Sequence, residues 1–213
     1  MKTRFIMIRH GLSLANEQKR FAGNSNFELA DLGHRQAELC AEALKNEKID
    51  AIYASDLQRA YCTAAPLGRI KGIEVVPCKG LREIFAGEWE GKTFDELCSS
   101  YSEAYTVWRE DVGRAKCTGG ESVVELSKRV LGTLGEIAEQ NPDKTVCIAT
   151  HATPIRAVCT AAAGLDVCDM AEIKWVSNAS ISIFDYEDGA FTAVSVDNTD
   201  HLGSLITGFP SNV

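Results

Sequence analysis

The chain has 213 residues and a formal net charge of -8, with 45% hydrophobic and 24% charged residues. This length and composition predict a single globular domain over residues 1–213. The acidic charge disfavours nucleic acid and anionic membranes as partners, because both attract excess Lys and Arg, but it is compatible with a locally basic pocket for a small anion.

The first part of the chain alternates short apolar runs with helical patterns. Three runs are predicted as strands, at residues 4–8, 49–54 and 74–76. The first run shows no alternation, which is typical of a strand buried on both faces. Asp31 is predicted to cap a helix that ends at Lys45, and Ser55 to cap a helix that Pro66 breaks.

The alternation continues to the end of the chain. The remaining elements are helices over residues 93–109 and 122–139, a buried strand over 145–150, a helix from Thr153, and a hairpin of residues 180–186 and 191–196. Thr153 is the expected cap of its helix, with Pro154 at the first position and Gly164 just past the end. Strands that alternate with helices predict an α/β fold, a three-layer α/β/α sandwich with a mostly parallel central sheet.

One segment fits this alternation poorly. Residues 87–120 show the weakest core pattern, and we interpret them as an excursion that caps the substrate over one end of the sheet. Trp89, Tyr105 and Trp108 either line this cap or pack in the core, and the sequence leaves both interpretations open.

The cysteines and histidines carry no recognisable metal or disulfide signature. The chain has 8 cysteines without a C-x-x-C pair, and neither H-E-x-x-H nor any Cys/His ligand spacing occurs. The first residues resemble a strand and not a signal peptide, and no apolar run approaches the ~20 residues of a membrane span. We therefore expect reduced thiols, a cytoplasmic location, no membrane association, no metal and no cofactor.

Two strands end in histidine. Residues 4–8 lead into Arg9, His10 and Gly11, and the strand over 145–150 leads into His151. Because ligands bind at the carboxyl ends of strands in open α/β sheets, both histidines should lie on one rim, together with Arg59 from the helix that follows the second strand. Arginine matches phosphate oxygens, and a neutral imidazole is a nucleophile, so this set predicts phosphoryl transfer.

Such a reaction also needs a proton donor for the leaving oxygen. Glu83, between apolar neighbours after the strand at 74–76, is the best candidate, and Glu88 and Glu90 compete with it. The alternative is that Glu83 forms an ion pair with Arg82 or Lys92.

Several spaced segments together resemble one family. They are RHGLSLAN (9–16), LADLGHRQA (29–37), ASDLQRAYCTA (54–64), LREIFAGEWEGKT (81–93), GGES (119–122), THATPIRA (150–157) and VDNTDHL (196–202). In this order they resemble the histidine phosphatase superfamily, which includes the cofactor-dependent phosphoglycerate mutases, and within it the branch of broad-specificity and alpha-ribazole phosphatases.

The resemblance implies a role for each site residue. His10 would be the phosphohistidine nucleophile and Glu83 the proton donor. Arg9, Arg59 and His151 would form the phosphate pocket. Asn16 would be a further ligand, or simply a cap, and the backbone N–H of Ala152 would also reach the phosphate. Hydrolysis of a small phosphorylated metabolite is the expected activity.

Other functions remain open beside that activity. A phosphoglycerate mutase and a non-catalytic phospholigand-binding protein are the alternatives, although the segment at 81–93 resembles the phosphatases.

Some residues depart from the family pattern or have an open role. Leu12 and Ser13 stand where family members often have Glu or Gln and Thr, so Leu12 predicts a more apolar pocket entrance. Lys92, Lys116 and Arg109 either meet a second anionic group or are surface charges. His34 is expected on a solvated helix face and His201 in a structural role. The sequence leaves the oligomeric state and the physiological substrate open.

Overall fold

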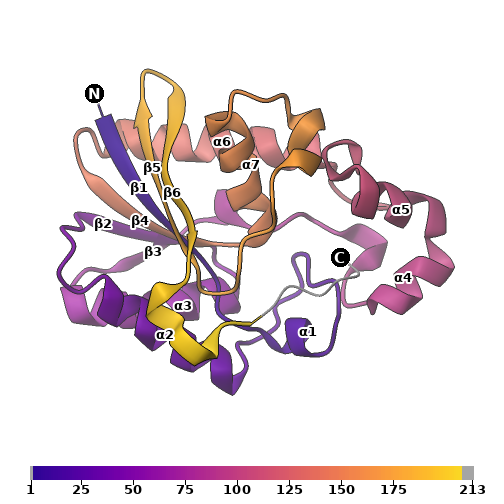
Figure 1. Ribbon diagram of the computed structural model, residues 1–213, viewed down its shortest axis with the longest axis horizontal. Helices are drawn as coiled ribbons and strands as arrows, with labels where there is room; N and C mark the ends of the chain where they lie inside the picture. Colours follow the sequence, from indigo (N-terminus) through magenta and orange to yellow (C-terminus); the bar gives the residue numbers. More distant parts are fainter. Residues whose placement is uncertain (1, 208–213) are drawn as a thin grey trace.

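The computed structural model describes residues 2–207, which form one six-stranded sheet with helices on both faces (Figure 1). The strands are β1 (Lys2–Arg9), β2 (Ala51–Ala54), β3 (Val75–Pro77), β4 (Thr145–Thr150), β5 (Ile181–Glu187) and β6 (Ala190–Asn198). They lie in the order β3-β2-β4-β1-β5-β6. β3, β2, β4 and β1 pair in parallel, whereas β5 pairs antiparallel with β1 and with β6. The predicted mostly parallel sheet with a terminal hairpin is therefore confirmed.

Two helices cover each face of the sheet. They are α2 (Asp31–Ala43) and α3 (Gln58–Lys71) on one face, and α6 (Val123–Gln140) and α7 (Ala152–Ala162) on the other (Figure 1). Phe5 and Met7 of β1 pack in the hydrophobic cluster that contains α6 and α7, and Ile6 and Ile8 pack in the cluster that contains α2 and α3. This double burial explains the apolar run without alternation, and it confirms the three-layer α/β/α sandwich.

Two features of α3 differ from the sequence prediction. The helix begins after Leu57, not at Ser55, and the side-chain oxygen of Asn26 accepts a hydrogen bond from the Gln58 amide at 2.8 Å. Pro66 lies inside the helix, which continues to Lys71. An interior proline costs about 3 kcal/mol. Pro66 and Leu67 are both buried, so packing against the sheet offsets that cost.

The predicted caps of α2 and α7 are each displaced by one or two residues. Ala30 occupies the N-cap position of α2, so Asp31 is its first helical residue. His151 occupies the N-cap position of α7, which places Thr153 and Pro154 inside the first turn. α7 follows β4 almost directly: β4 ends at Thr150, His151 is the N-cap, and α7 begins at Ala152.

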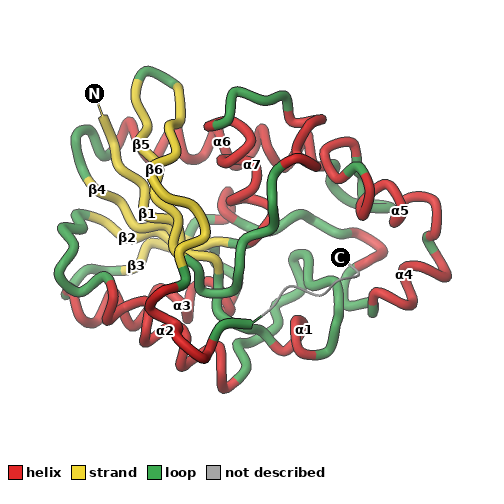
Figure 2. Tube along the Cα trace, viewed as in Figure 1, coloured by secondary structure: helices red, strands yellow, loops and turns green. Residues whose placement is uncertain are grey.

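The excursion over residues 87–120 is helical and well packed, contrary to its weak core pattern. Figures 1 and 2 show its two helices, α4 (Phe94–Ser100) and α5 (Ser102–Glu110), beside the sheet layers and not on a sheet face. They are separate because Tyr101 has non-helical dihedral angles (φ -134, ψ 36), so the single predicted helix was wrong. Trp89, Tyr105 and Trp108 are all buried in one core cluster.

The remaining elements are short. They are α1 (Leu14–Glu17) and the 3-10 segments η1 (Lys79–Leu81), η2 (Gly87–Trp89), η3 (Val112–Arg114), η4 (Val167–Glu172) and η5 (Asp200–Leu205). No helix within residues 2–207 combines the length and apolar character that a membrane crossing requires.

Candidate active site

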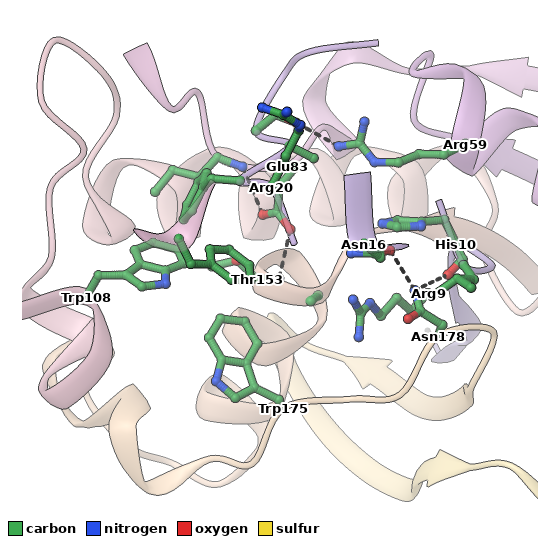
Figure 3. A pocket seen from close by; sticks show the side chains of 17 residues that line it. Arg9, His10, Asn16, Arg20, Arg59, Glu83, Trp108, Thr153, Trp175 and Asn178 are labelled. Atoms are coloured by element: carbon green, nitrogen blue, oxygen red, sulfur yellow. Dashed lines mark hydrogen bonds between the residues drawn. The ribbon is translucent and has the colours of Figure 1, made fainter. Parts of the chain in front are cut away.

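A pocket of about 110 Å³ opens where β1, β2 and β4 end. Most of the predicted site residues line it, namely Arg9, His10, Asn16, Arg59, Glu83 and Ala152. Figure 3 shows Arg9, His10 and Asn16 close together, with Glu83 beside Thr153 facing the same space. His151 does not line the pocket; it is fully buried, and its ring centroid lies 5.2 Å from that of His10.

His10 is held in one tautomer. Its Nδ1 lies 2.7 Å from the carbonyl oxygen of Gly11, which can only accept a hydrogen bond, so Nδ1 carries the proton and Nε2 keeps its lone pair. Burial, and then the positive charges of Arg59 and Arg9, lower the pKa of His10 well below its ordinary value. The imidazole is therefore neutral near pH 7, which is the state that a nucleophile needs.

Three arginines line the pocket, Arg9, Arg20 and Arg59 (Figure 3). Arg9 and Arg59 are buried and are held by main-chain carbonyl groups. Arg9 Nη1 donates to the carbonyl of Val176 at 2.5 Å. Arg59 Nη1 and Nη2 donate to Ser25 and Gly23 at 2.8 and 2.6 Å, and the buried Arg59 Nε has no hydrogen-bond partner. Burial lowers the pKa of each guanidinium to about 10, so both remain charged at neutral pH. A phosphate oxygen would satisfy the unpaired Nε donor.

His151 is oriented by a serine. Its Nε2 lies 2.8 Å from Ser55 Oγ, and Ser55 Oγ also accepts a hydrogen bond from the Leu57 amide at 3.4 Å. The buried Nδ1 has no partner. If the Ser55 hydroxyl donates to Nε2, Nδ1 carries the proton and offers a donor to an anion bound beside His10. Burial and the charge of Arg59 lower the pKa of His151 well below its ordinary value.

Asn16 serves as a cap and also faces the pocket. Its Oδ1 accepts a hydrogen bond from the Ser13 amide at 3.2 Å, and its own amide donates to Ser13 Oγ at 3.3 Å; these two bonds form the capping box of α1. Oδ1 also accepts from the Ser13 hydroxyl at 2.9 Å. The same oxygen accepts a hydrogen bond from Asn178 Nδ2 at 3.2 Å. With Oδ1 engaged in this way, Nδ2 is the atom of Asn16 suited to meet a phosphate oxygen.

Glu83 is fixed by main-chain donors and not by an ion pair. Its Oε1 accepts from the Ile84 amide at 2.9 Å, and its Oε2 accepts from the Thr153 amide in the first turn of α7 at 3.3 Å. Arg82 pairs instead with Asp56 at 2.6 Å, and Lys92 lies 5.9 Å from the ring centroid of Tyr101. The proposed ion pair of Glu83 is therefore wrong for both predicted partners.

The competing acids are directed elsewhere. Glu88 accepts a hydrogen bond from the Tyr101 hydroxyl at 3.1 Å, and Glu90 accepts from the amides of Asn24 and Ser25. Neither carboxylate lines the pocket, whereas Glu83 does.

Gly11 lies where the end of β1 packs closely against α2. Its amide donates to Thr63 Oγ1 at 3.0 Å. A Cβ at Gly11 would lie 2.5 Å from the carbonyl oxygen of Gly33 in α2. The glycines therefore permit close backbone packing between the end of β1 and α2.

Part of the pocket wall is apolar. Phe21, Ile84, Phe94, Trp108 and Trp175 line the pocket, and Leu12 lines it as well. Trp108 thus belongs both to the core and to the pocket wall. Lys92, Lys116 and Arg109 do not line the pocket, although Arg109 borders a separate cavity behind Trp108 and Trp175.

Comparison with known proteins agrees with this geometry. The family model described as "Histidine phosphatase superfamily (branch 1)" matches residues 5–199. The chain belongs to this superfamily. The match spans the strand ends, the Glu83 loop and the excursion, so the family resemblance predicted from the sequence is confirmed.

Several relatives of this histidine phosphatase are named as phosphatases. Phosphoserine phosphatase 1 of Hydrogenobacter thermophilus is 32% identical over 202 residues, covering 95% of each chain. Glucosyl-3-phosphoglycerate phosphatase of Mycobacterium tuberculosis (strain H37Rv) is 34% identical over 185 residues, covering 83% of this chain and 82% of the relative. The structure of a mycobacterial glucosyl-3-phosphoglycerate phosphatase superposes with a TM-score of 0.85 at 30% identity, covering 93% and 100% of the two chains. Phosphoric monoester hydrolysis is thus the activity that these relatives support.

The sequence prediction missed several residues that line the pocket, among them Arg20, Trp175 and Asn178, and it also missed the contact of Ser55 with His151. Ser55 was interpreted as a helix cap, although its position at the end of a strand was a usable signal. Trp175 and Asn178 lie in the connection before β5, which carries no motif, and only the fold brings them to the pocket. Asn178 Nδ2 donates to the carbonyl of His10 at 3.1 Å and so supports the loop after β1.

The other two histidines lie outside the pocket, as predicted. His34 is exposed on α2. His201 Nε2 lies 3.0 Å from the carbonyl of Ala179, a structural contact. Within residues 2–207, no group of three or more His, Cys, Asp or Glu side chains is arranged to hold a metal ion.

Proposed function

We propose that this histidine phosphatase hydrolyses a small phosphomonoester through a phosphohistidine on Nε2 of His10, without a metal ion. The observation that carries the proposal is the 2.7 Å contact between His10 Nδ1 and the Gly11 carbonyl, which leaves Nε2 unprotonated in a pocket with two buried arginines. Arg9, Arg59 and His151 are proposed to bind the phosphate, together with Asn16 and the backbone N–H of Ala152.

In the first step the Nε2 lone pair of His10 attacks phosphorus, and the bond from phosphorus to the leaving oxygen breaks. Glu83 gives its proton to that oxygen, so an alcohol leaves and Glu83 becomes a carboxylate. The imidazole ring gains positive charge as the N–P bond forms. The Gly11 carbonyl, already bonded to Nδ1–H, stabilises this charge, and the arginines stabilise the phosphoryl oxygens.

In the second step water replaces the alcohol beside Glu83. The carboxylate takes a proton from water, the water oxygen attacks phosphorus, and the N–P bond breaks. Inorganic phosphate is released, and His10 and Glu83 return to their starting states. The Thr153 and Ile84 amides hold the Glu83 carboxylate between the two steps.

The proposal is tested by assaying p-nitrophenyl phosphate and a panel of phosphorylated metabolites with EDTA present, beside His10→Ala. Phosphoserine and glucosyl-3-phosphoglycerate, the compounds in the names of the relatives, are the first members of that panel. Quenched turnover should trap a phosphoryl group on His10 that is labile to acid and stable to base. Loss of activity in EDTA, or unchanged labelling of His10→Ala, would contradict the mechanism.

The relatives also bear on the alternatives. They are named as phosphatases and not as mutases, and each residue of the proposed mechanism is present. Both facts support hydrolysis over phosphoglycerate mutation or ligand binding without catalysis. A requirement for a priming bisphosphate would reverse this choice.

We also propose that the protein acts in the cytoplasm on a small soluble metabolite. The eight cysteines, which are all free, support a reducing compartment. The apolar pocket wall supports a substrate whose alcohol part is partly apolar.

A further inference from the structure

Two carboxylates near the pocket accept hydrogen bonds from main-chain amides and do not line the pocket. Glu90 is the first of them. Its Oε1 accepts from the amides of Asn24 at 2.8 Å and Ala86 at 3.0 Å, and its Oε2 accepts from the amide and hydroxyl of Ser25 at 2.6 and 2.5 Å. One side chain thus joins the loop before α2 to the start of the excursion.

Glu121 is the second of these carboxylates, and Arg129 of α6 is its partner. The two form a bidentate pair, with Arg129 Nε to Oε1 at 2.9 Å and Nη2 to Oε2 at 2.8 Å. Glu121 Oε2 also accepts from the Phe85 amide at 3.1 Å, and the Glu121 amide donates to the Phe85 carbonyl at 2.8 Å.

Each carboxylate holds the backbone that supports one proposed site residue. The Ser25 and Gly23 carbonyls, in the loop bound by Glu90, are the acceptors of the Arg59 guanidinium. Arg129 donates to the carbonyls of Gly80 and Arg82, each at 3.0 Å, and of Glu83 at 3.3 Å. The backbone on both sides of Glu83 is therefore attached to α6.

We propose that these carboxylates are separate positioning residues: Glu90 orients Arg59 for phosphate binding, and Glu121 with Arg129 orients Glu83 for proton transfer. The inference rests on the proposed function, in which Arg59 binds phosphate and Glu83 is the acid. None of Glu90, Glu121 and Arg129 lines the pocket, so none of them is placed to contact substrate. Each holds backbone that supports a site residue, and the charge of Glu90 also stabilises the Arg59 guanidinium. Misplacement of a reacting group by about 1 Å costs on the order of 10²-fold in rate, so both attachments should matter.

The test uses isosteric substitutions. Glu121→Gln and Glu90→Gln keep the shape of the side chain but turn one acceptor into a donor that faces N–H groups. Glu125→Gln is the matched control, because Glu125 is a capping-box carboxylate of the same helix α6 whose Oε2 alone accepts from Ser122.

The two variants should differ in their kinetic effects. Glu121→Gln should lower kcat/KM for β-glycerophosphate, which has a poor leaving group, by roughly 10-fold to 100-fold, with less than about a 3-fold change for p-nitrophenyl phosphate. Arg129→Lys should behave in the same way. Glu90→Gln should lower kcat/KM for both substrates by a similar factor of about 10 and raise the inhibition constant of orthovanadate to match. Glu125→Gln should change neither.

Amide hydrogen exchange gives a second readout that does not depend on chemistry. Exchange should accelerate at residues 84–85 in Glu121→Gln and at residues 24–25 in Glu90→Gln, with other regions unchanged. Equal losses on both substrates in Glu121→Gln, or unaltered exchange at these amides, would overturn the inference. If Glu83→Gln itself shows no dependence on the leaving group, the proposed acid is wrong, and the exchange data alone decide whether the backbone is held as described.

Discussion

The two sides of the pocket are built in different ways. His10 and His151 follow neighbouring parallel strands, β1 and β4, whose register pairs Arg9 with Thr150, and the His10 amide donates to the Thr150 carbonyl at 2.9 Å. Glu83, in contrast, lies between η1 and η2 on a segment outside any helix or strand. His10, the proposed nucleophile, is thus placed by the sheet, whereas Glu83, the proposed acid, is placed by individual hydrogen bonds.

The two sides of the pocket are therefore held in position by different parts of the structure. The strand ends inherit their positions from a core that is buried on both faces, so few local contacts are needed to hold them. The loop that carries Glu83 is not part of the sheet, and its position depends on hydrogen bonds to Arg129, to Glu121 and to the first turn of α7. Substitutions on the two sides of the pocket should therefore differ in how they lower the activity.

The largest expected effect lies on the sheet side. His10→Ala removes the only atom proposed to bond to phosphorus, so kcat on p-nitrophenyl phosphate should fall by roughly 10⁴-fold or more. His34→Ala, at an exposed position of α2, is the control and should retain full activity. Steady-state release of p-nitrophenol measures both. Activity in His10→Ala within about tenfold of wild type would remove His10 from the nucleophile role.

On the side of the pocket formed by the Glu83 loop, the expected loss of activity depends on the leaving group of the substrate. Glu83→Gln should lower kcat/KM for an alkyl phosphate by roughly 10²-fold to 10⁴-fold, because the alkoxide then leaves without a proton. The loss on p-nitrophenyl phosphate should be much smaller, since its leaving group is stable as an anion. Glu88→Gln, outside the pocket, should change neither rate. Equal losses on both substrates would refute the acid role.

The close packing between the end of β1 and α2 can be tested by measuring the free energy of unfolding. Gly11→Ala places a methyl group against the Gly33 carbonyl and should lower the free energy of unfolding by roughly 1–3 kcal/mol. Gly132→Ala is the matched control, because a Cβ at that exposed position of α6 meets nothing within 4 Å. It should stabilise the protein by about 0.5–1 kcal/mol, through reduced backbone entropy of the unfolded chain. Urea denaturation compares the two, and equal effects would contradict the close backbone packing.

The buried histidines predict a pH dependence of stability. In the folded protein the pKa values of His10 and His151 are lowered well below 6.5, the ordinary value that applies to the unfolded chain. Below pH 6.5 the unfolded chain therefore binds more protons, and the free energy of unfolding falls as the pH falls. The slope approaches about 1.4 kcal/mol per pH unit for each such histidine, and the contribution is constant above about pH 7.

Thermal unfolding between pH 7 and pH 5 measures this dependence. His151→Gln should show a shallower decrease in Tm than wild type, whereas His34→Gln, whose imidazole is exposed, should not differ from it. Parallel curves for wild type and His151→Gln would mean that His151 is not held neutral by the fold.

Local patterns in the sequence were enough to predict much of the molecule. Apolar runs and helical spacing identified every strand and the main helices, and the motifs that follow strand ends identified Arg9, His10 and Arg59, which line the pocket. These features can be predicted from sequence because a parallel strand that is buried on both faces must be a continuous apolar run, and because ligands bind at the carboxyl ends of such strands. The start of α3, the continuation of that helix through Pro66 and the break at Tyr101 were missed, because tertiary packing overrides local propensity there.

Only the tertiary structure decided which contacts orient the site. The sequence alone cannot show that Gly11 faces Gly33, that Ser55 bonds to His151, or that Glu90 and Glu121 bind backbone amides while Glu83 faces the pocket. The physical reason is the same in each case. A hydrogen bond or a close approach requires that the distance between two segments far apart in the chain be set to within a few tenths of an ångström, and no local pattern encodes that distance.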